Sequence, residues 1–306
     1  METPAKPEDD RLTAETPLDL SVVIPAFNEE GAVRAEVEVV HGILAKSGKR
    51  FEIIVVDDGS TDRTAAEAAL APCRLIRQKE NRGYGASLKR GIAEAKSDVI
   101  VITDADGTYP AEAILQLLAV ADDFDMVVGS RTGKEVHVPL SRRPAKWVLT
   151  KLASYLAGRE IPDLNSGLRL LRRHHVARYE RILPSGFSFT TTITLSLLCN
   201  DYSVGYVPID YRKRTGTSKI RPTHAYHFGM LILRVIMLFN PLKIFLPLGA
   251  LLFVIGLGKF IYDCFKQNLS ELAVFGLLGA LLIWSIGLLA DQNARLALER
   301  KGYERR

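Results

Sequence analysis

The sequence predicts an α/β domain with a mostly parallel, Rossmann-like sheet, followed by an interfacial helix and a two-helix transmembrane hairpin. Three observations favour this fold class. Short apolar runs alternate with segments of helical periodicity between residues 20 and 131. Several of these runs are almost entirely apolar, which is typical of parallel strands buried on both faces. Beyond residue 240, two apolar stretches are each close to the roughly 20 residues that span a bilayer.

The alternation of strands and helices can be followed through the first 131 residues. Strands are expected at residues 21–27, 51–60, 73–78, 98–106 and 124–130. Helices are expected at residues 28–48, 60–70, 81–97 and 110–121. Asn28 is expected to cap the first helix, because a short polar side chain can accept hydrogen bonds from the free N–H groups of a helix start.

The pattern loosens after residue 131. An amphipathic helix is expected at residues 141–158, and later strands within residues 163–173 and 202–214. Residues 222–240 mix apolar side chains with His and Arg, which favours a helix lying at a membrane interface. The chain then divides into a flexible tail (1–19), the α/β domain (20–221), juxtamembrane helices (222–242), two transmembrane helices (243–291) and a basic tail (292–306).

The formal charge of +5 is unevenly distributed. Basic residues cluster at 212–221, before the first apolar stretch, and at 295–306, after the second, whereas the turn 263–271 has one lysine and two acids. The positive-inside rule therefore predicts an integral membrane protein whose α/β domain and both termini are cytoplasmic. Because the basic residues flank the two spans, they indicate membrane orientation and contact with anionic lipid, and no nucleic-acid partner is expected.

Cysteine and histidine give no sign of a metal or disulfide framework. Cys73, Cys199 and Cys264 have no paired spacing. His174 and His175 lack metal-type partners and are expected at the surface. The polar, acidic start of the chain is not typical of a signal peptide, which agrees with a domain in a reducing cytosol.

Polar residues follow three of the predicted strands, where each strand ends. They are residues 25–30, 57–60 and 104–106. In a sheet of this class, ligands bind outside the carboxyl ends of the strands, so these residues predict a site. The sequence has no G-x-G-x-x-G after the first strand and no Walker-type phosphate loop, which disfavours a dinucleotide-binding domain and a nucleotide hydrolase of that kind.

The acidic pair Asp104 and Asp106 predicts a divalent cation. Residues at i and i+2 of an extended backbone project to the same side, and their hard oxygen atoms suit Mg²⁺ or Mn²⁺. Such a cation would let an acidic site accept the diphosphate of a nucleotide. The alternative is that Asp106 caps a helix. Asp58 is expected to accept hydrogen bonds from a base or ribose, with capping of a helix near Ser60 as its alternative.

Seven segments together resemble a known family. The segments IPAFNEE, VVDDGSTD, NRGYG and DADGTYP resemble glycosyltransferase family 2, which has the GT-A fold. The segments GSR (129–131), NSGLRLLRR (165–173) and YRKRTGTSKI (211–220), followed by two spans, resemble its polyprenyl-phosphate glycosyltransferases. That subgroup includes dolichyl-phosphate mannose synthases and undecaprenyl-phosphate glucosyltransferases. The resemblance extends over residues 20–221 by motif and over the remainder by topology.

The resemblance implies substrates and residue roles. The donor would be a nucleotide diphosphate sugar such as UDP-glucose or GDP-mannose, the acceptor a polyprenyl phosphate, and a homo-oligomer is a possible state. The donor site would comprise Pro25, Phe27, Glu29, Asp58, Asp104, Ala105, Asp106 and Arg131, with Asp104 and Asp106 as ligands of Mg²⁺ or Mn²⁺. The acceptor phosphate would contact Lys213, Arg214, Ser218 and Lys219, and the catalytic residues would be Asp106, Arg131, Arg214 and Lys219.

The sequence departs from relatives in two places. Relatives often carry Gln two residues after the second aspartate, where this chain has Thr108, so the third protein ligand of the metal is open. Many inverting relatives that glycosylate hydroxyl groups carry an acidic base where residues 185–198 have threonines and no carboxylate. A phosphate acceptor needs no base, because it is already largely ionised at neutral pH. The sequence therefore predicts inverting, metal-dependent transfer of a hexose to a lipid phosphate.

Alternative interpretations remain beside this one. A processive polysaccharide synthase shares the fold but carries a Q-x-x-R-W motif and more spans, and this sequence has neither. A non-catalytic membrane scaffold would be expected to lose Asp104 and Asp106, and both are present. The basic segment 212–221 can also be read as only the positive flank of a membrane span.

Overall fold

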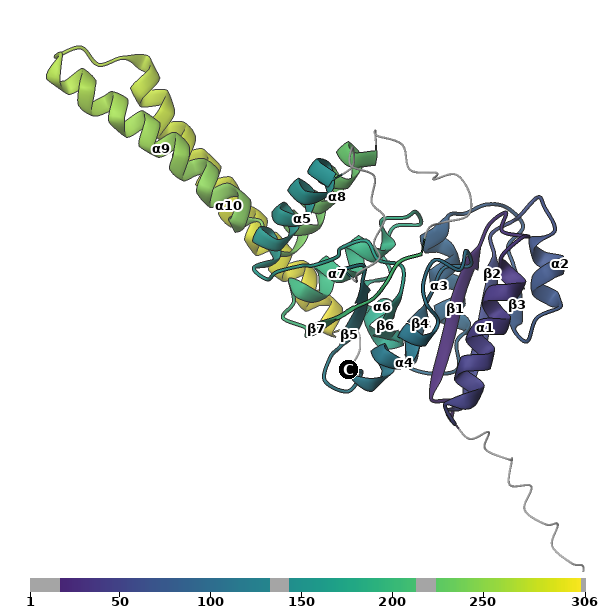
Figure 1. The fold of residues 1–306 in the computed structure, drawn as a ribbon. Coiled ribbons are helices and arrows are strands. Elements are labelled where there is room, and N and C mark those ends of the chain that lie inside the picture. The colour runs from purple at the N-terminus through teal and green to yellow at the C-terminus, as the bar shows by residue number, and fades with distance from the viewer. Residues whose placement is uncertain (1–16, 133–142, 213–223, 304–306) are drawn as a thin grey trace, which may run out of the picture.

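The computed structural model describes residues 17–132, 143–212 and 224–303, and Figure 1 shows their arrangement. A seven-stranded sheet lies at the centre of the N-terminal domain. Its strands are β1 (Leu20–Ala26), β2 (Phe51–Asp57), β3 (Arg74–Arg77), β4 (Val99–Ile102), β5 (Met126–Ser130), β6 (Arg169–Arg172) and β7 (Val204–Pro208). They are arranged in the order β3-β2-β1-β4-β6-β5-β7. The prediction of a mostly parallel sheet is confirmed, since only β6 runs antiparallel to its neighbours.

Ten helices are present in the described part of the chain. They are α1 (Val33–Lys46), α2 (Thr64–Ala69), α3 (Tyr84–Glu94), α4 (Glu112–Ala119), α5 (Arg143–Ala157), α6 (Arg173–Tyr179), α7 (Phe189–Leu198), α8 (His224–Phe239), α9 (Leu242–Phe265) and α10 (Glu271–Tyr303). The predicted alternation of strands and helices is therefore confirmed, with ends that differ by a few residues.

Helices cover both faces of the sheet because successive strand residues point to opposite sides. Val22 and Ile24 of β1 belong to an apolar cluster with α1, α2 and α4. Val23, between them, belongs to a second cluster with α3, α6 and α7. Both clusters consist of fully or nearly fully buried apolar side chains, most of them aliphatic, which explains why the strands are apolar without alternation.

Two local expectations are wrong. Asn28 does not cap α1, which begins at Val33 with Ala32 in the cap position and no side-chain cap. Asn28 instead has a φ of 53°, and its Oδ1 accepts a hydrogen bond from the backbone N–H of Thr61 at 2.9 Å, which joins the loops after β1 and β2. His175 is not a surface residue, because α6 packs it into the domain with 3% of its surface exposed.

Helices α5, α7 and α8 form a third apolar cluster next to the sheet. Ala153 of α5, Leu195 of α7 and Ile232 and Ile236 of α8 are buried in it. The segment predicted as an interfacial helix is thus helical, and one of its faces is packed against protein. Its position at a membrane interface stays a prediction.

Helices α9 and α10 form a hairpin that projects away from the α/β domain (Figure 1). Both are long and apolar enough to cross a membrane, and most of their surface lies outside the protein core. Gly256 and Gly276 let the two backbones approach closely, since a Cβ added to either would lie 2.9 Å from the facing chain. Helix α10 continues without a break past residue 291, so most of the segment predicted as a separate basic tail is helical.

Candidate active site

The three polar strand ends lie at one edge of the sheet, as predicted. Strands β2, β1 and β4 are neighbours and run parallel, so their carboxyl ends share that edge. Ala26 at the end of β1 pairs with Asp57 of β2, and its carbonyl oxygen accepts a hydrogen bond from the N–H of Asp58. Of the predicted donor residues on this segment, Pro25 is buried within β1, whereas Phe27 and Glu29 are half-buried in the loop beyond it.

Asp58 anchors the turn that precedes α3. Its Oδ1 accepts hydrogen bonds from Gln78 Nε2 and from the N–H of Arg82, both at 2.9 Å. Its Oδ2 accepts from the N–H of Gly83 at 2.8 Å, and the residue is 3% exposed. Asp58 does not cap α2, which begins at Thr64 without a side-chain cap. The carboxylate of Asp58 thus already accepts hydrogen bonds from the protein backbone. Its contact with a nucleoside stays a prediction.

The same turn contacts the acidic pair. Tyr84, the first residue of α3, donates a hydrogen bond from its hydroxyl to Asp104 Oδ1 at 3.0 Å. Burial and the charge of Asp104 raise the pKa of Tyr84 well above its usual value, so this hydroxyl remains a donor. The glycine-rich turn thus belongs to the site, and it also fits closely against the segment before α7. A Cβ on Gly83 would lie 2.5 Å from the carbonyl oxygen of Ser185.

Asp106 is held by the residue that replaces the glutamine of relatives. Thr108 is buried, and its hydroxyl donates to Asp106 Oδ1 at 2.6 Å while its N–H donates to the same oxygen at 3.2 Å. Helix α4 begins at Glu112 without a side-chain cap, so the alternative that Asp106 caps a helix is wrong. Ala105, between the two aspartates, is buried in the core.

Glu36 of α1 is a site residue that the sequence analysis missed. It is 7% exposed, and its Oε1 has no hydrogen-bond partner among the described residues. Burial, together with the charges of Asp106 and Asp104, raises the pKa of Glu36 to about 7. The available signal was a glutamate at a helical position shared with the buried Val33, Val37 and Val40.

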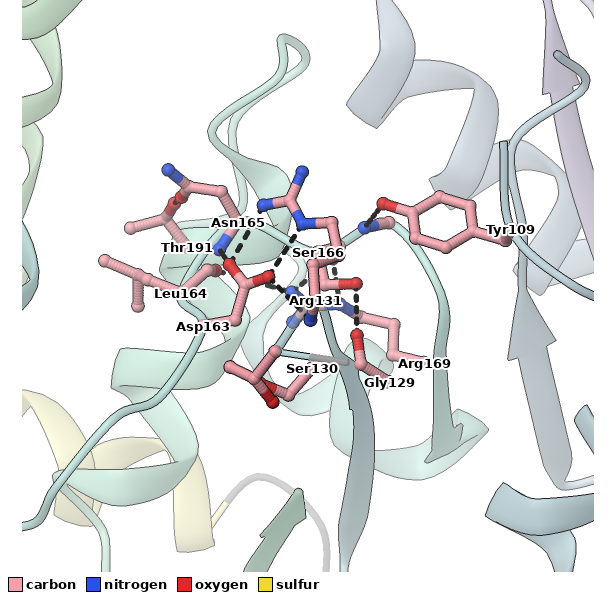
Figure 2. A network of polar contacts seen from close by, with 12 residues as sticks. Tyr109, Gly129, Ser130, Arg131, Asp163, Leu164, Asn165, Ser166, Arg169 and Thr191 are labelled. Atoms are coloured by element: carbon pink, nitrogen blue, oxygen red, sulfur yellow. Dashed lines mark hydrogen bonds and ion pairs between the residues drawn. The ribbon is translucent and has the colours of Figure 1, made fainter. Parts of the chain in front are cut away.

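Arg131 forms a two-point ion pair, shown in Figure 2. Its Nε donates to Asp163 Oδ2 at 2.7 Å, and a terminal nitrogen donates to Oδ1 at 2.9 Å. The guanidinium also lies over the ring of Tyr211, 5.2 Å from the ring centre. These contacts raise the pKa of Arg131 and fix its position, so it stays charged at the edge of the site.

The segment that begins with Asp163 closes one side of the site. The N–H of Gly167 donates to the hydroxyl oxygen of Tyr109 at 2.6 Å, and a Cβ on Gly167 would lie 2.7 Å from Asp104 Oδ2. Asn165 Oδ1 accepts a hydrogen bond from Thr191 Oγ1 at 2.7 Å, which connects this segment to α7 (Figure 2). Helix α7 has buried threonines and no carboxylate, so it offers no general base.

The predicted acceptor residues Lys213, Arg214, Ser218 and Lys219 lie outside the described residues. The chain directly before them is attached to the loop of the acidic pair. The N–H of Arg212 donates to the carbonyl oxygen of Thr108 at 3.0 Å. The rings of Tyr211 and Tyr109 meet edge to face with centres 5.3 Å apart.

The carboxylates at this edge fit a divalent cation. In the described part of the chain, no three His, Cys, Asp or Glu side chains already surround a common point. However, Mg²⁺ and Mn²⁺ are commonly held by two carboxylates, with waters and substrate phosphates completing the shell. Glu36, whose carboxylate lies against the turn at Gly107, adds a buried oxygen, Oε1, that has no hydrogen-bond partner among the described residues.

Comparison with known proteins agrees with this fold and site. Residues 21–179 match the family described as glycosyl transferase family 2, and residues 240–296 match the GtrB C-terminal hairpin. The first match covers more than half of the 306 residues. The chain therefore belongs to glycosyltransferase family 2, and its hairpin is of the GtrB type.

Three relatives illustrate the range of similarity. The chain is 33% identical over 206 residues to dolichyl-phosphate hexose transferase of Haloferax volcanii, covering 67% of this chain and 87% of that protein. It is 29% identical over 308 residues to undecaprenyl-phosphate 4-deoxy-4-formamido-L-arabinose transferase of Pectobacterium atrosepticum. That match covers 91% of this chain and 89% of the relative. It is 32% identical over 221 residues to dolichol-phosphate mannosyltransferase of Pyrococcus furiosus. That match covers 67% of this chain and 60% of the relative.

Solved structures show the same fold. Glucosyl-3-phosphoglycerate synthase from Mycobacterium tuberculosis, in complex with Mn²⁺, UDP-glucose and phosphoglyceric acid, superposes with a TM-score of 0.57. Its sequence is 19% identical, and the match covers 72% of this chain and 80% of that one. At this identity the likeness establishes the fold alone, and it confirms the predicted GT-A architecture.

Proposed function

We propose that this protein transfers a hexose from a nucleotide diphosphate sugar to a polyprenyl phosphate, with inversion at the sugar carbon. The proposal is carried by the acidic pair, Asp104 and Asp106, after β4, together with helix α7, which has buried threonines and no carboxylate. The activities of the relatives from Haloferax, Pectobacterium and Pyrococcus, as their names give them, support a lipid phosphate acceptor. UDP-glucose and GDP-mannose are the donors we propose, with undecaprenyl or dolichyl phosphate as the acceptor.

The chemistry requires two anions to approach one another. An oxygen of the lipid phosphate forms a bond to C1 of the sugar, while the bond between C1 and the diphosphate oxygen breaks. The lipid phosphate has a second pKa of about 6, so no proton has to be removed before the attack. A phosphate acceptor is therefore compatible with threonines in α7. An acceptor hydroxyl group would instead benefit from a carboxylate base.

Separate groups of residues would stabilise the negative charges of the donor and of the acceptor. Asp104 and Asp106 would hold Mg²⁺ or Mn²⁺, which neutralises the departing diphosphate. Arg131, fixed by Asp163, would direct its remaining donor atoms toward the diphosphate and sugar. Lys213, Arg214, Ser218 and Lys219 follow Arg212 directly, and they would contact the acceptor phosphate.

The membrane arrangement follows from the hairpin and the charges on either side of it. The basic residues that flank the two spans support a cytoplasmic position for the domain and both termini. The acceptor head group would then meet the site at the cytoplasmic leaflet. Formation of a homo-oligomer stays a prediction that is based on the resemblance to relatives.

The test is a transfer assay with membranes that contain the full chain. Labelled UDP-glucose and GDP-mannose are each incubated with undecaprenyl or dolichyl phosphate, and the label is followed into the organic phase. Label in that phase, lost with a chelator and lost in Asp106→Asn, is the expected result. Label only in insoluble polymer would favour a processive synthase. A folded protein that transfers no label from any donor would favour a scaffold.

A further inference from the structure

Glu36 is a buried acid on an otherwise apolar face of α1. Val33, Val37 and Val40 occupy the neighbouring positions of that face, and all three are completely buried against the sheet. A carboxylate in such surroundings destabilises the folded protein unless it is paired or hydrogen-bonded. A partner for Glu36 is therefore expected.

No described residue supplies such a partner to one of the two carboxylate oxygens of Glu36. Oε1 of Glu36 has no hydrogen-bond partner among the described residues. Oε2 lies against the turn of the acidic pair, since a Cβ built on Gly107 would come within 3.6 Å of it. The strongest charges acting on Glu36 are those of Asp106 and Asp104, which are negative, and the cation that opposes them is Arg212, whose side chain is exposed. Glu36 thus faces an excess of negative charge.

Thr108, two residues after Asp106, already forms a hydrogen bond with that aspartate. The hydroxyl of Thr108 donates its hydrogen to Asp106, so Thr108 positions that aspartate. Mg²⁺ and Mn²⁺ keep several waters when few protein ligands are present, and those waters need acceptors in the protein. Oε1 of Glu36 is a buried acceptor on a side chain that lies against the turn of the acidic pair.

We propose that Glu36 is a third acidic group of the metal site, which accepts hydrogen bonds from waters on the cation that Asp104 and Asp106 hold. This inference rests on the metal dependence in the proposed function and assigns a position to a residue outside the D-x-D motif. Glu36 is a positioning residue that acts on the bound cation through its water shell. The cation in turn balances a buried charge that is otherwise unpaired.

The test measures binding of Mn²⁺ alone, without turnover. The full chain in detergent is titrated with Mn²⁺ at pH 8, with and without UDP, and free Mn²⁺ is followed by electron paramagnetic resonance. Glu36→Gln is expected to raise the Kd for Mn²⁺ about 10-fold or more. Glu38→Gln is the matched control, because Glu38 is exposed on the same helix and pairs with Arg34.

A second readout separates this role from that of an ordinary core residue. Without Mn²⁺, Glu36→Gln is expected to unfold at a higher temperature than the parent chain, because an unpaired buried charge is gone. With Mn²⁺, the parent chain is expected to gain more in unfolding temperature than the variant. Glu36→Met, which keeps the length of the side chain, should show the same two shifts.

The outcomes distinguish this inference from the proposed function. If the parent chain and Glu36→Gln bind Mn²⁺ equally and gain equally in unfolding temperature, the role of Glu36 is refuted while the metal site stands. If the parent chain binds no Mn²⁺ even with UDP, the metal dependence and the role of Glu36 both fail. A lower unfolding temperature of both variants without Mn²⁺ would identify Glu36 as a structural residue and overturn the inference.

Discussion

The hydroxyl of Tyr84 donates a hydrogen bond to Asp104 Oδ1 at 3.0 Å. Tyr84 is the first residue of α3, and the turn directly before it is held by the carboxylate of Asp58. Two of the predicted site aspartates are therefore connected through one turn, although they end different strands. The position of Asp104 thus depends in part on a tyrosine at the end of the turn that Asp58 holds.

Tyr84→Phe is expected to lower the affinity for Mn²⁺ or the transfer rate by about 10-fold to 100-fold, since it removes a hydrogen bond that orients Asp104. The measurement is the transfer rate as a function of Mn²⁺ concentration. Tyr202→Phe is the control, because its hydroxyl accepts a hydrogen bond from Arg178 on α6. An unchanged Mn²⁺ dependence in Tyr84→Phe would show that Asp104 is oriented by other contacts.

Asp163→Asn is expected to destabilise the protein by about 3 kcal/mol, because it leaves the guanidinium of Arg131 without its buried partner. The double variant Arg131→Met with Asp163→Leu is expected to lose less than the sum of the two single changes. Thermal unfolding in detergent measures both effects. Additive losses in the double variant would mean that the ion pair has no coupling energy.

The protein is expected to lose stability in mild acid because of the buried His175. Its ring is buried, with Nε2 at 3.3 Å from Asp125 Oδ1 and the ring of His174 at 4.2 Å, and burial lowers its pKa below 6.5. The unfolded chain then binds a proton more readily than the folded one, so stability falls as the pH drops below about 6.5. In unfolding temperatures measured from pH 8 to pH 5, His175→Gln should flatten this fall. An equally steep fall in His175→Gln would assign it to other groups.

The membrane hairpin can be tested with a pair of glycines on α9. Gly256→Ala is expected to destabilise the protein by about 1 to 3 kcal/mol, because the new Cβ would lie 2.9 Å from the backbone of α10. Gly258→Ala is the control, since a Cβ there meets nothing within 4 Å. Thermal unfolding in detergent compares the two. Equal behaviour of both variants would show that the helices do not depend on this close contact.

The sequence was sufficient for the strands and helices of the first 131 residues and for the acidic edge, because both depend on local patterns, whereas α6 and α7 were not predicted. Buried parallel strands are continuously apolar, and the pair Asp104 and Asp106 directly follows such a strand. The contacts that organise the site are not local. Asp163 pairs with Arg131 across 32 positions, and Gln78 contacts Asp58 across 20, and no periodicity encodes either distance.

Three other features escaped prediction for identifiable reasons. Strand β6 is a run of four residues, and its composition does not reveal that it is antiparallel. Asn28 precedes a helical pattern, but its left-handed backbone places the side chain against Thr61. Glu36 was concealed by the apolar periodicity of α1, in which one charged residue has little weight.

The reversed direction of β6 brings a later part of the chain to the edge of the sheet that carries the acidic pair. Because Arg169 at its start lies beside Ile102 at the end of β4, a loop that leads into a strand faces a loop that leads out of one. The outgoing loop carries Asp104 and Asp106, while the incoming loop carries Asp163 and Gly167. Insertions before Asp163 would lengthen the opposite wall, whereas a larger side chain at Gly167 would collide with Asp104. The length of this wall can therefore change without altering the strand that precedes the acidic pair.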